Sequence, residues 1–158
     1  MSIEKQRSDH LAKKLKIINI CGGPGAGKSK IRAGLFNLMK EARISCEEVT
    51  EYAKGVTWDN NQDKLSDQLY IFAKQNRQLE RLRGKVDWVV SDSPLILSMH
   101  YRPLNYFPET FGSLVKEVWN SYENINFFIN RVGSYDPAGR NQIEEEAKLI
   151  DIQIKQLL

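Results

Sequence analysis

Short apolar segments alternate along the chain with longer segments whose apolar residues repeat at helical spacing. Four of the short segments, residues 17–21, 46–50, 86–91 and 125–129, are rich in β-branched and aromatic side chains and predict β-strands. Strands that alternate with helices are typical of an α/β fold. We therefore expect a mainly parallel sheet flanked by helices.

The segments between the predicted strands divide into helices and polar loops. Helical patterns predict helices over residues 29–41, 66–83, 95–100, 110–122 and 142–158. Polar or proline-containing stretches without a clear period predict loops over residues 55–64, 102–108 and 131–140. Gly84 directly follows the second predicted helix, where a glycine commonly ends a helix.

Length and composition place limits on the class of protein. The chain has 158 residues, so we expect a single domain over residues 1–158. No apolar run approaches the roughly 20 residues needed to cross a membrane. Residues 1–15 form a polar, basic lead-in without a secretory signal. We therefore expect a cytoplasmic protein with no membrane partner, in which Cys21 and Cys46 remain unpaired.

The formal net charge of +3 is mild. It fits a protein with phosphate ligands but does not demand nucleic acid as a partner. The lysines of the lead-in permit contact with nucleic acid, and a solvated arm explains the same composition.

A phosphate-binding loop stands between the first predicted strand and the helix that follows it. Its residues match the pattern G-x-x-x-x-G-K-[ST] and are Gly22, Gly23, Pro24, Gly25, Ala26, Gly27, Lys28 and Ser29. In such a loop (a P-loop, or Walker A motif) backbone N–H groups and the helix dipole bind phosphate oxygens. We expect Lys28 to reach the outer phosphates and the Ser29 hydroxyl to help hold magnesium.

Charged residues follow the other three predicted strands. Glu51, Asp92 and Arg131 stand at these strand ends, and ligands of open α/β sheets bind outside the carboxyl ends of the strands. Asp92 follows a β-branched run as a Walker B acid does, and we expect it to hold magnesium or substrate. A capping role for the neighbouring Ser93 and Pro94 is compatible with this.

Glu51 and the loop at residues 131–140 leave alternatives open. Glu51 could accept the proton of a substrate hydroxyl or bind a ribose, and it could equally be a solvated carboxylate. Arg131 and Arg140 bracket a lid-like loop whose arginines could clamp a transferring phosphoryl group. The alternative is a pair of ordinary surface arginines.

With these residues in place, the chain resembles the P-loop kinase-like ATPases of the NadR type, an AAA-like P-loop family that includes the nicotinamide riboside kinase domain. The resemblance covers about residues 17–158. Its matching pieces are the P-loop, residues 51–54, the helix that contains Gln75, residues 92–94 and residues 135–140.

The resemblance implies a nucleoside/nucleotide kinase-like P-loop NTPase fold with ATP and magnesium as cofactors. It assigns phosphates and metal to Lys28 and Ser29, metal or substrate to Asp92, and the lid to Arg131 and Arg140. Glu51 looks like the acidic residue that deoxynucleoside kinases place after their second strand. Such kinases continue into a fifth strand, whereas this sequence stops at Leu158. We therefore expect either four parallel strands or another element in that place.

Three functions remain open on the sequence. The first is a kinase that moves the terminal phosphoryl group of ATP to a small hydroxyl-bearing substrate, such as a nucleoside, nucleotide or related riboside. The second is a regulatory or hydrolytic NTPase with a protein partner. The third is a kinase acting on a hydroxyl in DNA or on a modified base. A GTPase is disfavoured because no Asn-Lys-x-Asp motif occurs, and an AAA+ motor because its helical lid domain would not fit in this length.

Overall fold

A computed structural model of the chain describes residues 14–131 and 143–158. Its single sheet contains β1 (Lys16–Cys21), β2 (Cys46–Val49), β3 (Trp88–Ser91) and β4 (Glu123–Phe128) in the order β2-β3-β1-β4. Every neighbouring pair is parallel. The predicted α/β fold with a mainly parallel sheet is therefore confirmed, and the described residues hold four strands.

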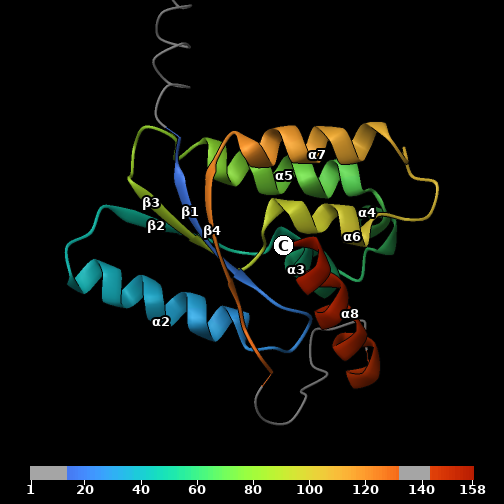
Figure 1. Cartoon of the computed structure of the whole chain (residues 1–158), viewed down its shortest axis with the longest axis horizontal. Helices are drawn as coiled ribbons and strands as arrows, with labels where there is room; N and C mark the ends of the chain where they lie inside the picture. The colour runs from blue at the N-terminus through green and yellow to red at the C-terminus, as the bar shows by residue number, and fades with distance from the viewer. Residues whose placement is uncertain (1–13, 132–142) are drawn as a thin grey trace, which may run out of the picture.

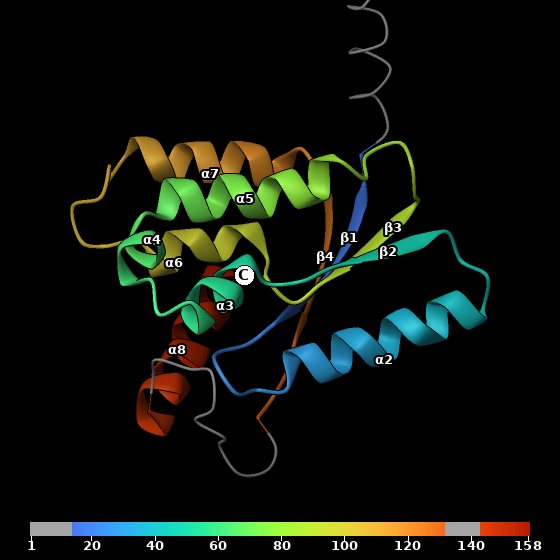
Figure 2. The same cartoon turned by 180° about the vertical axis from the view of Figure 1, so that it is seen from behind.

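Helices cover both faces of the sheet (Figures 1 and 2). One face packs on α2 (Lys28–Glu41) alone, with a small core that includes Ile20, Met39 and Val90. The opposite face carries a larger core beneath the helices η1 (Leu95–Leu97), α5 (Gln68–Glu80), α6 (Ser98–Tyr101), α7 (Thr110–Asn120) and α8 (Glu144–Leu157). No helix among the described residues is long and apolar enough to cross a bilayer.

The sequence prediction needs two corrections between β2 and β3. Residues 55–64 were predicted as a loop, but they contribute to α3 (Tyr52–Trp58) and α4 (Gln62–Ser66). The predicted helix over 66–83 begins later, at Gln68, because the Asp67 side chain caps it by accepting from the Tyr70 N–H. Short helices with few buried side chains lack the long apolar stripe on which the prediction relied.

The start of the first strand also differs from the prediction. Leu15 was assigned to the polar lead-in, yet its side chain is buried in the larger core. Lys16 begins β1, and its ammonium group lies over the Trp88 ring. The lead-in within the described residues is therefore shorter than expected, because one leucine among lysines packs against the core.

Candidate functional site

The P-loop links the end of β1 to the start of α2, as the sequence motif predicts. Gly27 precedes the first residue of α2 with a φ of 90°, in the left-handed region that favours glycine. Free backbone N–H groups at the start of a helix, together with its dipole, form an anion site. The Lys28 ammonium group donates to the Gly23 carbonyl at 3.0 Å. The loop therefore has the geometry for binding phosphate.

A cavity of about 450 Å³ opens beside the P-loop. Lys28, Ser29, Glu51 and Asp92 all line it, so the structure brings together four of the residues singled out in the sequence. The cavity extends from the loop toward α4, α5 and α6, where its lining includes Thr57, Leu65, Gln68, Ile71, Leu97, Ser98 and Tyr101. The phosphate site therefore continues into a mixed polar and apolar space large enough for a small organic ligand.

Glu51 and Lys28 influence each other's charge within this cavity. Burial raises the pKa of Glu51 above its ordinary value, while the charge of Lys28 lowers it and that of Asp92 raises it. Burial lowers the pKa of Lys28, and the carboxylates of Glu51, Asp92 and Asp151 raise it. Glu51 is therefore not the solvated strand-end carboxylate of the alternative interpretation. It is partly buried and occupies the N-cap position, directly before α3.

Asp92 lies at the end of β3 and is almost fully buried. Its Oδ2 atom lies 3.3 Å from Arg32 Nε on α2, and the Arg32 Nη1 group donates to Glu48 at 2.8 Å. Asp92 Oδ1 has no hydrogen-bond partner within residues 14–131 and 143–158. A buried carboxylate oxygen without a partner is costly, so its position beside the P-loop indicates a ligand.

The residues at this point fit magnesium. Magnesium prefers oxygen ligands, and it keeps several waters while binding one or two protein groups plus substrate phosphates. Asp92 and Ser29 line one cavity and carry such oxygens, and Asp92 Oδ1 has no hydrogen-bond partner within residues 14–131 and 143–158. Among the described residues no cluster of three His, Cys, Asp or Glu side chains forms a metal cage. The donor set therefore suits a metal shared with nucleotide phosphates.

Arg131 lies beside the P-loop and contacts both the loop and α8. It forms an ion pair with Asp151 of α8 at 2.9 Å and donates from Nη1 to the Pro24 carbonyl at 2.9 Å. The remainder of the predicted lid-like loop, including Arg140, lies outside the described residues. Among the described residues, Arg131 contacts the P-loop through Pro24 and is not part of the cavity lining.

Several residues at the site were not singled out by the sequence, although their positions carried a signal. Arg32 follows Lys28 by four residues, so both project from the same side of α2. Asp151 follows Ala147 by four residues and therefore lies in the apolar stripe of α8, where an acid needs a partner. Gln68 opens α5 and is buried at the cavity.

Gln75 and Gln78 of α5, Trp58 of α3 and Tyr101 of α6 are side chains that could in principle contact a nucleotide base. Gln75 is committed to the scaffold, because it accepts from the Tyr52 N–H at 2.9 Å and donates to the Thr50 carbonyl at 3.1 Å. Gln78 also donates to the Thr50 carbonyl. Trp58 is 61% exposed, whereas Tyr101 lines the cavity and burial raises its pKa. Of these four, Gln75 and Tyr101 line the cavity, and the side-chain amide of Gln75 already bonds to the backbone of Tyr52 and Thr50.

The cysteines behave as small core residues. Both are unpaired and buried, as predicted. Cys21 ends β1 beside the P-loop, and burial raises the pKa of its thiol to about 12. A thiol with such a pKa stays protonated near neutral pH and is a poor nucleophile.

The chain is similar to a known protein family and to solved structures. A family model described as an AAA domain matches residues 17–158. A solved structure of the APS kinase CysC from Mycobacterium tuberculosis, in a cysteine-to-alanine mutant, is similar at 17% sequence identity with a TM-score of 0.46. That similarity covers 90% of this chain and 99% of the other. No curated protein matches the sequence.

Proposed function

The chain belongs to the AAA domain family, and we propose that it is an ATP-dependent kinase for a small hydroxyl-bearing substrate. The substrate class is a nucleoside, nucleotide or related riboside. Within the family, the order of the P-loop, residues 51–54 and residues 92–94 along the chain favours the NadR type. ATP would bind at the P-loop with magnesium held by Ser29 and Asp92.

The observation that carries this proposal is the shared cavity. Lys28 and Glu51 line one space of about 450 Å³ that continues past the P-loop toward Gln68 and Ser98. A hydrolytic site needs room for a water molecule, whereas this space suits an organic acceptor with polar groups. The cavity therefore supports transfer to a substrate over bare hydrolysis.

Each residue has a role in the proposed reaction. The P-loop backbone and Lys28 bind and orient the phosphates, so that charge on the transferred group is stabilised without reorganisation. Glu51 accepts the proton of the attacking hydroxyl, and its raised pKa brings it nearer to the working range of a general base. Bound magnesium supplies further neutralisation of phosphate charge.

Turnover of ATP against a panel of acceptors tests the proposal. The panel comprises nucleosides, mononucleotides, nicotinamide riboside and an oligonucleotide with modified bases. We expect at least one small acceptor to raise ATP consumption, and Lys28→Ala to abolish that increase while the protein remains folded. Stimulation by the oligonucleotide alone would favour the kinase for nucleic acid. ATP consumption that no member of the panel raises would favour the regulatory or hydrolytic NTPase.

A further inference from the structure

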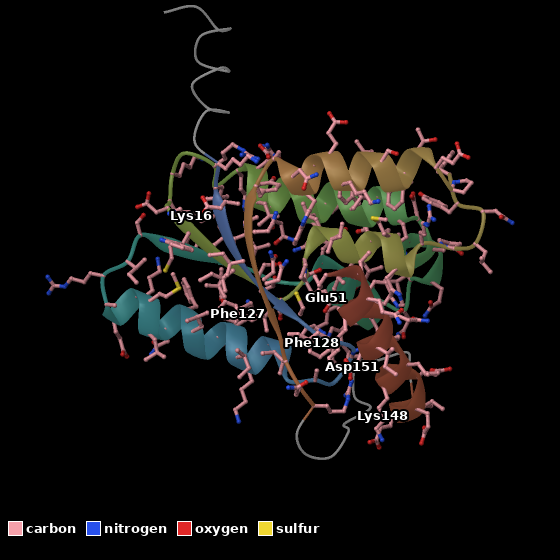
Figure 3. All side chains as sticks on the ribbon, viewed as in Figure 1. Lys16, Glu51, Phe127, Phe128, Lys148 and Asp151 are labelled. Carbon is pink, nitrogen blue, oxygen red and sulfur yellow. The ribbon has the colours of Figure 1, made fainter. Side chains whose placement is uncertain are left out.

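The terminal helix α8 contacts the P-loop through one carboxylate. Asp151 Oδ1 accepts from the backbone N–H of Gly23 at 2.5 Å. Asp151 Oδ2 accepts from Arg131 Nη2 at 2.9 Å and Nε at 3.2 Å. Arg131 Nη1 in turn donates to the Pro24 carbonyl at 2.9 Å. Asp151 and Arg131 thus join two adjacent residues of the P-loop, Gly23 and Pro24, to α8, and we call these four residues the loop clasp. Figure 3 shows where Asp151 lies on α8.

Gly23 of the P-loop packs closely against α8. The P-loop pattern leaves this position unrestricted. A methyl group at Gly23 would lie 2.7 Å from both the Ala147 carbonyl oxygen and Asp151 Oδ1. A side chain at position 23 would therefore displace α8 or the loop. The close approach of α8 is therefore a reason for glycine at this position.

The negative charge of Asp151 lies close to the phosphate-binding loop. Asp151 lies close enough to Lys28 that its carboxylate raises the pKa of that lysine. A carboxylate this close to a phosphate-binding loop repels a triphosphate. Its two side-chain oxygens are used by Gly23 and Arg131, and the side chains of Asp151 and Arg131 are only 15% and 12% exposed. Because a negative charge at Asp151 disfavours phosphate binding, we expect its bonds to Gly23 and Arg131 to benefit the site in another way.

We propose that Asp151 is a positioning residue, which fixes the P-loop through Gly23 and through Arg131 so that the loop is preorganised for nucleotide. Holding the first residues of the loop in place lowers the entropy that phosphate binding must otherwise overcome. This inference rests on the proposed nucleotide site but is independent of the phosphoryl acceptor. Binding measured without any acceptor therefore tests it separately from kinase activity.

The variant Asp151→Asn separates positioning from simple charge. Loss of a negative charge near the loop would by itself tighten the binding of an ATP analogue. Loss of the charge-assisted bonds to Gly23 and Arg131 should weaken that binding by about tenfold. We therefore expect weaker binding of a non-hydrolysable ATP analogue in calorimetric titration. Unchanged or tighter binding would overturn the proposal.

A matched control and a second measurement keep the test independent of folding and of nucleotide. Glu145→Gln removes the same charge from an exposed position on the same helix, and it should leave binding unchanged. Backbone amide exchange in the nucleotide-free protein should rise across residues 22–27 in Asp151→Asn and not in Glu145→Gln. Equal exchange in the two variants would contradict the loop clasp even if neither bound nucleotide.

A double-mutant cycle tests whether Asp151 and Arg131 act as one unit, and its Arg131→Gln member can be measured even if Asp151→Asn is poorly folded. Because Asp151 and Arg131 act through each other, Arg131→Gln should also weaken binding of the ATP analogue. The double variant should bind the analogue about as tightly as the single variant with the lower affinity. Additive losses would show that the two residues act separately and would remove Arg131 from the proposal.

Discussion

Arg32 Nε lies 3.3 Å from Asp92 Oδ2, and this contact joins the helix after the P-loop to the end of the third strand. The same guanidinium group donates to Glu48 at the adjacent edge of the sheet. Arg32 places one cation beside two carboxylates, while Asp92 Oδ1 has no hydrogen-bond partner among the described residues. Arg32 thus couples the phosphate loop to the carboxylate that we assign to the metal.

Replacing Arg32 tests this coupling through stability. Arg32→Gln should lower the free energy of unfolding by about 2 kcal/mol, because it leaves Asp92 buried beside a neutral group. The loss is smaller than for a fully buried pair since the Glu48 side chain is 33% exposed. Urea denaturation measures the difference, and Lys30→Gln on an exposed face of the same helix serves as control. Equal midpoints in the two variants would contradict a structural role for Arg32.

Asp92→Asn tests the assignment of magnesium. The variant should reduce the gain in ATP-analogue affinity that magnesium provides by about 10- to 100-fold, as loss of an ordered metal partner does. Affinity measured in EDTA should change little, because the P-loop itself is intact. Glu48→Gln is the matched control, since Glu48 also contacts Arg32. If Asp92→Asn kept the full effect of magnesium, the metal would have to be held elsewhere.

Protonation of Glu51 should cause the fall in the rate of phosphoryl transfer at low pH. Its pKa is raised above the ordinary 4.5 mainly by burial, so the rate should fall with decreasing pH at values above 4.5. Glu51→Gln should lower phosphoryl transfer by about 10²- to 10⁴-fold while analogue binding persists. A full transfer rate in Glu51→Gln would exclude this residue as the base.

The same pKa shift has a consequence for stability. A carboxyl group whose pKa is higher in the folded protein binds more protons when folded, so stability falls as pH rises through the interval above 4.5. Glu51→Gln removes that loss. The variant should therefore be more stable than the wild type near neutral pH, and the two should converge below pH 4.5. Denaturation at several pH values measures this, and a variant less stable at every pH would contradict the sign.

A buried arginine stabilises the opposite end of the sheet. The Arg83 side chain is 1% exposed, pairs with Glu80 at 2.6 Å and donates to the Ser121 carbonyl at 3.1 Å. Arg83→Met should reduce the free energy of unfolding by about 3 kcal/mol, because Glu80 loses its ion pair with Arg83 and the Ser121 carbonyl loses a donor. Arg81→Met, at an exposed position of the same segment, should have little effect. Nucleotide binding per folded molecule should be equal in both.

The elements that the sequence predicts well are those whose signal is local. β1, the P-loop and the start of α2 follow from a contiguous motif and an apolar strand, and all are present where expected. α3 and α4 were missed because their stability comes from packing on α5 and not from a periodic apolar stripe. Pattern alone cannot supply such tertiary support.

The residues of the candidate site also divide into those that the sequence predicts and those that it does not. Lys28, Ser29 and Asp92 are placed by strand ends, so sheet topology brings them together. The partners of Arg131 are Asp151 and Pro24, which are far apart in sequence, and only the packing of α8 on the loop decides that contact. The sequence therefore predicts the residues that meet phosphate better than those that hold the loop.

The destination of the terminal phosphoryl group tests the central claim most directly. ATP labelled at its terminal phosphate is incubated with the protein, magnesium and the acceptor panel, and labelled products are separated. The proposed kinase predicts label on a small hydroxyl-bearing acceptor, with transfer lost in Lys28→Ala. Label recovered only as inorganic phosphate, at a rate that no acceptor alters, would contradict it.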